Sequence, residues 1–106
     1  MSFCILLLTC ANQNEADKIT NNLLDKKLIV CCKRFPLNSS FLWQGAKEVN
    51  SEVMLIMDSR EDLFDEIEEE VRKLHSYKTF VLTALPISKT TKDVENWMNT
   101  ELKPES

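Results

Sequence analysis

His75 is the only histidine of the chain and the residue best suited to acid–base or metal chemistry. Any Ser-His-Asp or Cys-His arrangement would have to use it, and imidazole is a good copper ligand. His75 also follows directly after a predicted helix, where interaction with the helix C-terminal carbonyls is an ordinary role. A structural role is favoured over catalysis or metal binding, and a lone imidazole predicts only weak binding of copper or another divalent cation.

Four cysteines are the other soft donors, at Cys4, Cys10, Cys31 and Cys32, and no two have Cys-x-x-Cys spacing. Cys31 and Cys32 are adjacent in a predicted strand, so their side chains point to opposite faces and cannot chelate one metal ion. We therefore expect free thiols that act as small buried hydrophobes in a reducing compartment.

Trp43-Gln44-Gly45 contains the only glycine of the chain, between two apolar stretches. A sharp reversal between strands needs positive φ, which glycine adopts without a Cβ penalty, so this segment predicts the turn of a long hairpin. Trp43, Tyr77 and Trp97 could stack a planar ligand. As isolated aromatics in a small acidic protein, they are expected instead to seal a core or a subunit interface.

Length and charge limit the class of protein. The chain has 106 residues, which predicts one domain over residues 1–106, and its net charge of -4 argues against nucleic acid and anionic membranes as partners. No apolar run approaches the roughly 20 residues needed to cross a bilayer. The apolar segment Phe3–Leu8 lacks the basic residues that precede a signal sequence, so it predicts a buried strand and a cytoplasmic protein.

The first half of the chain predicts three strands and one helix. Strands are expected at Phe3–Thr9, at Leu28–Cys32 with an interruption at Pro36-Leu37-Asn38 before it resumes through Trp43, and at Glu48–Asp58. Asn12, with Glu15 three positions later, resembles a capping box that opens a helix ending near Lys26-Lys27. Pro36 indicates a bulge or an edge strand.

The second half predicts two helices around one strand. Ser59 is expected to cap a helix whose buried stripe is Leu63, Ile67, Val71 and Leu74. A strand follows at Thr79–Leu85, and Thr90 or Thr91 caps a short final helix. That helix carries Val94, Trp97, Met98 and Leu102 on one side.

This order of elements is β-α-β-β-α-β with an additional C-terminal helix. It predicts an α+β, ferredoxin-like sandwich with a long central hairpin, in which both main helices cover one face of an antiparallel sheet. The runs Ile5–Leu8 and Val53–Met57 are apolar at consecutive positions, so both sheet faces require burial. A symmetric homo-oligomer would cover the open face.

With these elements placed, a series of short motifs can be read in order along the chain: Leu8-Thr9, Leu24-Asp25-Lys26-Lys27-Leu28, Cys31, Pro36, Ser39, Trp43-Gln44-Gly45, Ser51-Glu52-Val53, His75-x-Tyr77, Leu85-Pro86 and Trp97. In their order and spacing, residues 3–102 resemble the CutA family of divalent-cation tolerance proteins. The resemblance implies a ferredoxin-like subunit, a homotrimer, a cytoplasmic location and a connection to copper and other divalent metals. A copper site proposed in some members falls here on Leu8, Leu74 and His75, and Cys31 aligns with the family cysteine.

We therefore expect a non-enzymatic, CutA-like homotrimer that takes part in tolerance of divalent metal ions and requires no cofactor. His75 is the first metal candidate and Cys31 the second, while Trp43, Gly45, Tyr77 and Trp97 are expected structural or interface residues. One alternative is a trimeric regulatory module that binds a small molecule in clefts between subunits. Another is a structural scaffold whose ancestral site has decayed.

Overall fold

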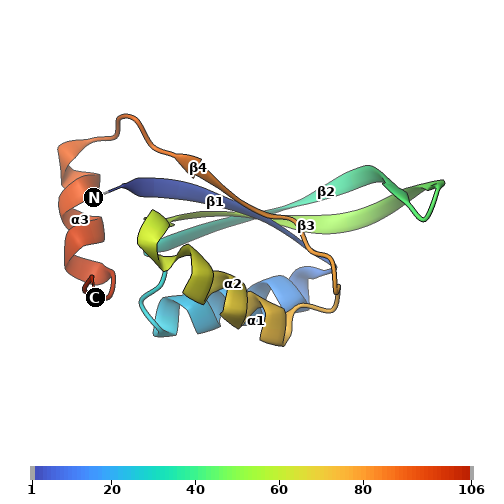
Figure 1. The fold of residues 1–106 in the computed structure, drawn as a ribbon, viewed down its shortest axis with the longest axis horizontal. Helices are drawn as coiled ribbons and strands as arrows, with labels where there is room; N and C mark the ends of the chain where they lie inside the picture. Colours follow the sequence, from blue (N-terminus) through green and yellow to red (C-terminus); the bar gives the residue numbers. More distant parts are fainter. Residues whose placement is uncertain (1, 106) are drawn as a thin grey trace.

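A four-stranded antiparallel sheet forms the body of the protein, and two helices cover one of its faces (Figure 1). The computed structural model describes residues 2–105. The strand order is β2-β3-β1-β4. The elements are β1 (Phe3–Cys10), α1 (Gln13–Asp25), β2 (Cys31–Trp43), β3 (Ala46–Arg60), the 3₁₀ turn η1 (Glu61–Leu63), α2 (Phe64–Leu74), β4 (Leu82–Pro86) and α3 (Lys92–Glu101). The prediction of a ferredoxin-like α+β sandwich is confirmed.

The core lies between the sheet and the helices α1 and α2. Alternate side chains of the central strand β1, from Cys4 to Cys10, are fully buried on the helix side. Ile19 of α1 and Ile67 of α2 are also fully buried and belong to the same cluster. The burial of this apolar surface stabilises the sandwich by about 25 cal/mol per Å² removed from water.

Among residues 2–105, no helix lies over the opposite face of the sheet, and this face is also apolar. Ile5 pairs with Leu85 of β4, and Phe35 of β2 pairs with Met54 of β3, so each pair shares this face. Phe35 is 42% exposed and Leu85 is 46% exposed. The expectation of an open apolar face is confirmed for the single chain.

The hairpin of β2 and β3 projects beyond the body of the molecule (Figure 1). Its outer part, residues 40–51, is exposed at every position and is called the arm below. Gln44 and Gly45 form the turn with φ of 50° and 82°, the positive values that a two-residue type I′ turn requires. The predicted hairpin is confirmed. Pro36 lies on the edge strand β2, and the pairing through it is regular, so there is no bulge.

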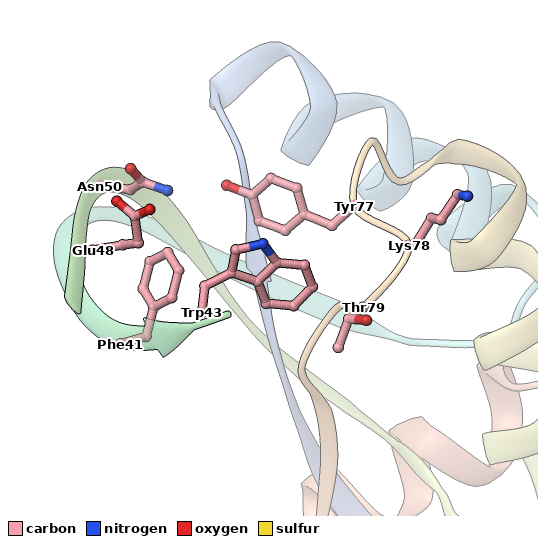
Figure 2. Close-up of a pocket in the computed structure, with 7 residues that line it drawn as sticks. All are labelled: Phe41, Trp43, Glu48, Asn50, Tyr77, Lys78 and Thr79. Carbon is pink, nitrogen blue, oxygen red and sulfur yellow. The ribbon is translucent and has the colours of Figure 1, made fainter. Parts of the chain in front are cut away.

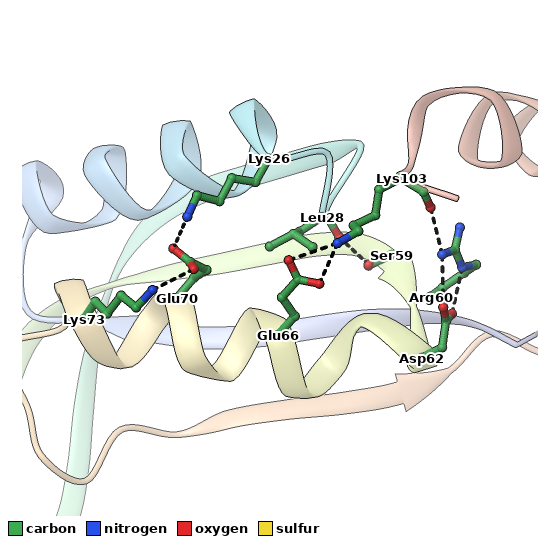
Figure 3. Close-up of polar contacts among 9 residues, drawn as sticks. All are labelled: Lys26, Leu28, Ser59, Arg60, Asp62, Glu66, Glu70, Lys73 and Lys103. Carbon is green, nitrogen blue, oxygen red and sulfur yellow. Dashed lines mark hydrogen bonds and ion pairs between the residues drawn. The ribbon is translucent and has the colours of Figure 1, made fainter. Parts of the chain in front are cut away.

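Ser59 does not cap the second helix, so that prediction was wrong. Ser59 is the penultimate residue of β3, fully buried, and its hydroxyl donates a hydrogen bond to the carbonyl of Leu28 (Figure 3). The helix begins through η1, without a side-chain cap. Leu74 was also misplaced in the buried stripe, since it is 40% exposed. The chain leaves the helix after Leu74, and His75 takes the buried position beside it.

The strand boundaries that differ most from expectation are the starts of β2 and β4. β2 begins at Cys31, because Leu28 and Ile29 are buried in the connection that leads to it. β4 begins at Leu82 rather than Thr79, because the preceding segment packs Phe80 on the His75 ring with 5.1 Å between ring centroids.

Carboxylates of α2 hold neighbouring elements in place (Figure 3). Glu70 accepts hydrogen bonds from Lys26, directly after α1, at 2.8 Å and from Lys73 at 3.1 Å. Glu66 accepts a hydrogen bond from Lys103 at 2.9 Å. The guanidinium of Arg60, only 2% exposed, donates to Asp62 and to the Lys103 carbonyl. These contacts fix α1, α2 and the C-terminal segment relative to the sheet.

Within residues 2–105, no helix has both the length and the apolar character needed to cross a membrane.

Candidate functional site

His75 lies directly after α2, and its ring is fully buried. Its backbone N–H donates to the Val71 carbonyl at 2.8 Å, which closes the helix. The ring Nδ1 accepts the backbone N–H of Tyr77 at 3.0 Å, and Nε2 lies 2.8 Å from the Thr9 carbonyl. Because the Tyr77 N–H can only donate, Nδ1 is the acceptor and Nε2–H is the donor to Thr9. In this tautomer the ring holds the end of β1 against the loop that follows α2.

Cys10 and Glu15 lie beside this ring. The thiol of Cys10, one carboxylate oxygen of Glu15 and one ring nitrogen of His75 all lie within 4.8 Å of one another, and the three residues are buried. The distance from His75 Nδ1 to Glu15 Oε2 is 3.6 Å. Cys10 is the last residue of β1 and Glu15 is in the first turn of α1. Three separate elements thus form one Cys10–Glu15–His75 cluster.

Glu15 is ionised in this cluster. Burial raises its pKa, but its carboxylate accepts the backbone N–H of Ala11 at 2.8 Å and that of Ser76 at 2.7 Å. The hydrogen bonds outweigh burial, so the pKa of Glu15 is lowered below its ordinary value. A carboxylate at the first turn of a helix is also favoured by the helix dipole. The cluster therefore carries one negative charge.

Cys10 is protonated. Burial, followed by the negative charge of Glu15, raises the pKa of its thiol to about 12. All four cysteines of the chain are free. An enclosed thiol with this pKa is a poor nucleophile unless a cation replaces its proton.

Cys31, the other predicted metal candidate, lies away from the cluster. It pairs with Asp58 of β3, whereas Cys10 pairs with Val53 of the same strand. Five residues of strand separate these positions by about 16 Å. Cys31 and His75 therefore do not belong to one site within a chain. Leu8, another of the positions that the family resemblance implies for copper, is fully buried in the core.

Sequence reasoning missed Cys10 and Glu15 as members of a site. Glu15 was interpreted as half of a capping box, and Asn12 does cap α1, accepting the Glu15 N–H at 2.9 Å. The Glu15 carboxylate does not return to Asn12 but bonds to Ala11 and Ser76. A signal was present in the sequence, because Glu15 lies four residues before the core residue Ile19 and so shares its buried side of the helix. A carboxylate there requires a partner.

A cavity of about 470 Å³ lies between the arm and the loop after α2 (Figure 2). Trp43 lies between Phe41 of the same strand and Tyr77 of the loop. The Tyr77 hydroxyl donates to Glu52 at 2.7 Å, and burial together with this carboxylate raises the pKa of Tyr77 to about 12. The remaining lining residues are Glu48, Asn50, Lys78 and Thr79. Because Tyr77 also bonds to His75 through its backbone, the cavity adjoins the cluster.

Two of the four predicted structural residues thus meet at one place, Trp43 and Tyr77. Gly45 lies at the tip of the arm. Trp97 is on α3, at the other end of the molecule (Figure 1), and is 44% exposed.

Comparison with known proteins identifies relatives across nearly the whole chain. Residues 4–101 match the model of the CutA1 divalent ion tolerance protein family. The divalent-cation tolerance protein CutA of Archaeoglobus fulgidus is 35% identical over 94 residues, which cover 89% of this chain and 92% of that protein. The protein of the same name from Thermotoga maritima is 32% identical over 90 residues, covering 85% of this chain and 89% of that protein.

A solved structure agrees with the sequence matches. The structure of the Archaeoglobus fulgidus protein, described as a periplasmic divalent cation tolerance protein CutA, superposes with a TM-score of 0.93 at 33% identity. The superposition covers 95% of this chain and 99% of that one.

Proposed function

This chain belongs to the CutA1 divalent ion tolerance family, and from that premise we propose that it is a non-enzymatic homotrimer that acts in tolerance of divalent metal ions in the cytoplasm. The continuous family match, from the first strand to the last helix, carries the proposal. The structure has the ferredoxin-like fold that this proposal requires.

The exposed apolar surface supports the homotrimer. The sheet face bearing Phe35 and Leu85 has no cover in the single chain, and Trp43 on the arm is 48% exposed. Soluble monomers rarely leave apolar surface of this extent uncovered. A closed ring of copies would cover it and would also form a second wall for the cavity at Trp43 and Tyr77. Trp97 on α3 is a further proposed contact.

The state of the cysteines and of His75 supports a binding role rather than catalysis. Cys10, the thiol nearest to the histidine, is enclosed and protonated. The His75 ring uses both of its nitrogens in hydrogen bonds to the backbone. A histidine held in this way keeps on Nδ1 a lone pair that a metal ion can compete for. With His75 as its only ligand, copper should bind weakly.

Native mass spectrometry of the reduced protein tests the proposal, because it reports assembly and bound ions together. We expect a mass of three subunits, with copper retained only when it is in excess. Growth of a copper-stressed host that lacks its own CutA protein should improve when this chain is expressed. A stable monomer, or a host that gains no tolerance, would contradict the proposed function.

The cavity at Trp43 supports a second candidate function, a regulatory module with a small-molecule ligand between subunits. A volume of about 470 Å³ lies within the range of ordinary ligand sites, and Trp43 and Tyr77 offer faces on which a planar molecule could stack. Screening planar metabolites by thermal shift, with Trp43→Ala as the control, separates this function from a scaffold without a ligand. A scaffold predicts no stabilisation by any of them.

A further inference from the structure

We propose that Cys10, Glu15 and His75 form a binding site for one zinc ion per subunit. This proposal rests on the proposed function, because a protein that acts in cation tolerance would use a zinc site. Of the Leu8, Leu74 and His75 positions that the family resemblance implies, it keeps only His75, since the other two side chains here are aliphatic. Cys10 and Glu15 supply the remaining ligands.

The three donors are a set that zinc accepts. Thiolate sulfur, imidazole nitrogen and carboxylate oxygen bind zinc at about 2.0–2.3 Å, and tetrahedral geometry then separates the donors by roughly 3.5 Å. The donor atoms of the cluster already lie within 4.8 Å of one another, and His75 Nδ1 is 3.6 Å from Glu15 Oε2. A contraction of about 1 Å by side-chain rotation would bring the three protein donors to zinc-binding distance, and a water molecule would take the fourth tetrahedral position.

The surrounding hydrogen bonds orient the donors as a metal site requires. The Nε2–H of His75 donates to the Thr9 carbonyl, which fixes the tautomer and leaves the lone pair of Nδ1 on the side of Glu15. The Glu15 carboxylate is held by the backbone N–H groups of Ala11 and Ser76. A ligating histidine usually makes a bond of this kind to a carbonyl, and a ligating carboxylate is usually hydrogen-bonded as well.

Binding exchanges protons and breaks one hydrogen bond, without any change of oxidation state. Zinc replaces the Tyr77 N–H at His75 Nδ1. The Cys10 thiol loses its proton to solvent, and Glu15 is already ionised. Two negative ligands and one neutral ligand then balance the double charge of the ion. A neutral complex is the form that a buried position favours.

Access to the site comes from the loop between α2 and β4. Residues 75–81 have no regular helix or strand, and Ser76, Lys78 and Thr79 are exposed. Because the Tyr77 N–H must leave the imidazole first, we expect zinc to enter slowly and to change the environment of the aromatic cavity. Tyr77 therefore serves as an intrinsic fluorescence reporter, together with Trp43 across the cavity.

Cobalt(II) is the spectroscopic probe of the site, added to the reduced, chelator-treated trimer without oxygen. We expect a thiolate-to-cobalt absorption band and tetrahedral d–d bands that saturate at one ion per subunit and disappear with one equivalent of zinc. Cys10→Ala should lower cobalt affinity by at least a factor of ten. Cys4→Ala is the matched control, because Cys4 is equally buried on the same face of β1 and should leave the bands unchanged.

Two results would overturn the site: wild-type protein without a thiolate band, or bands that persist in Cys10→Ala and vanish in Cys31→Ala. If Cys10→Ala does not fold, X-ray absorption of the zinc-loaded wild type decides instead. One sulfur at about 2.3 Å with nitrogen and oxygen neighbours supports the site, and zero or several sulfurs reject it. A trimer that confers copper tolerance but shows no thiolate band would refute the zinc site alone. A monomer with the band would refute the proposed function alone.

Discussion

Replacing Glu15 by Gln should destabilise the protein far more than its position in the first turn of α1 suggests. The carboxylate accepts two backbone N–H groups, one from Ala11 and one from Ser76, far along the chain. An amide keeps one accepting oxygen and places an NH₂ donor against the other N–H, whichever way it is turned. Hydrogen bonds to a charged group contribute about 1.5–3 kcal/mol, and a buried donor left unpaired costs about 1–3 kcal/mol. We expect a loss of about 3 kcal/mol.

Urea unfolding at one fixed subunit concentration, in the presence of a chelator, measures this loss. The midpoint should fall while the m-value stays constant, because the same surface is exposed on unfolding. Glu68→Gln is the control. Its carboxylate makes only an exposed pair with Arg72 at 3.0 Å, one helical turn away, which contributes about 0.3–0.5 kcal/mol. If the Glu15 and Glu68 variants differed by less than about 0.5 kcal/mol, the reasoning on the buried carboxylate would be refuted.

Three other measurements address the helices, the turn and the arm. The pKa of Glu70 is lowered to about 2 by hydrogen bonds from Lys26, Asn22 and Lys73. The ionised carboxylate should therefore stabilise the fold fully above the ordinary pKa of a glutamate, and this stabilisation should disappear as the pH falls toward 2. In an acid titration, Glu70→Gln should lack this part of the loss of stability. Gly45→Ala should cost about 1 kcal/mol through its positive φ alone, since no atom crowds the added Cβ, and faster amide exchange in the arm would report it. Trp43→Ala should lower the melting temperature of the proposed trimer sharply; an unchanged value would show that Trp43 is not an interface anchor.

The fold was predictable because its signals are local. Apolar runs mark β1 and β3, helical spacing marks α1 and α2, and the only glycine marks the turn of the hairpin. The errors arose where a tertiary contact decides the local structure. Ser59 has the residue type of a helix cap, but its hydroxyl is satisfied by the Leu28 carbonyl, on a segment that the sequence does not show to be adjacent.

The candidate site was predictable only in part. His75 was identified because it is the single histidine, and Trp43 and Tyr77 because isolated aromatics are conspicuous. Cys10 and Glu15 were not, because their proximity to His75 depends on how the end of β1, the start of α1 and the loop after α2 meet. The spacing of residues along the chain does not show that these three segments lie together. Only the placement of an acidic residue on the buried side of a helix indicated it.

The position of β1 in the sheet affects how the chain folds during its synthesis. β1 leaves the ribosome before the other strands of this sheet, yet it pairs only with later ones: Cys10 with Val53 of β3, and Leu8 with Leu82 of β4. The β2–β3 hairpin closes locally and can form within microseconds of its synthesis. Until β3 and β4 emerge, the apolar segment Phe3–Cys10 has no native partner and is open to association with other nascent chains. Synthesis from a slowly translated message should therefore lower the soluble yield, and supplying a chaperone that holds nascent chains should restore it.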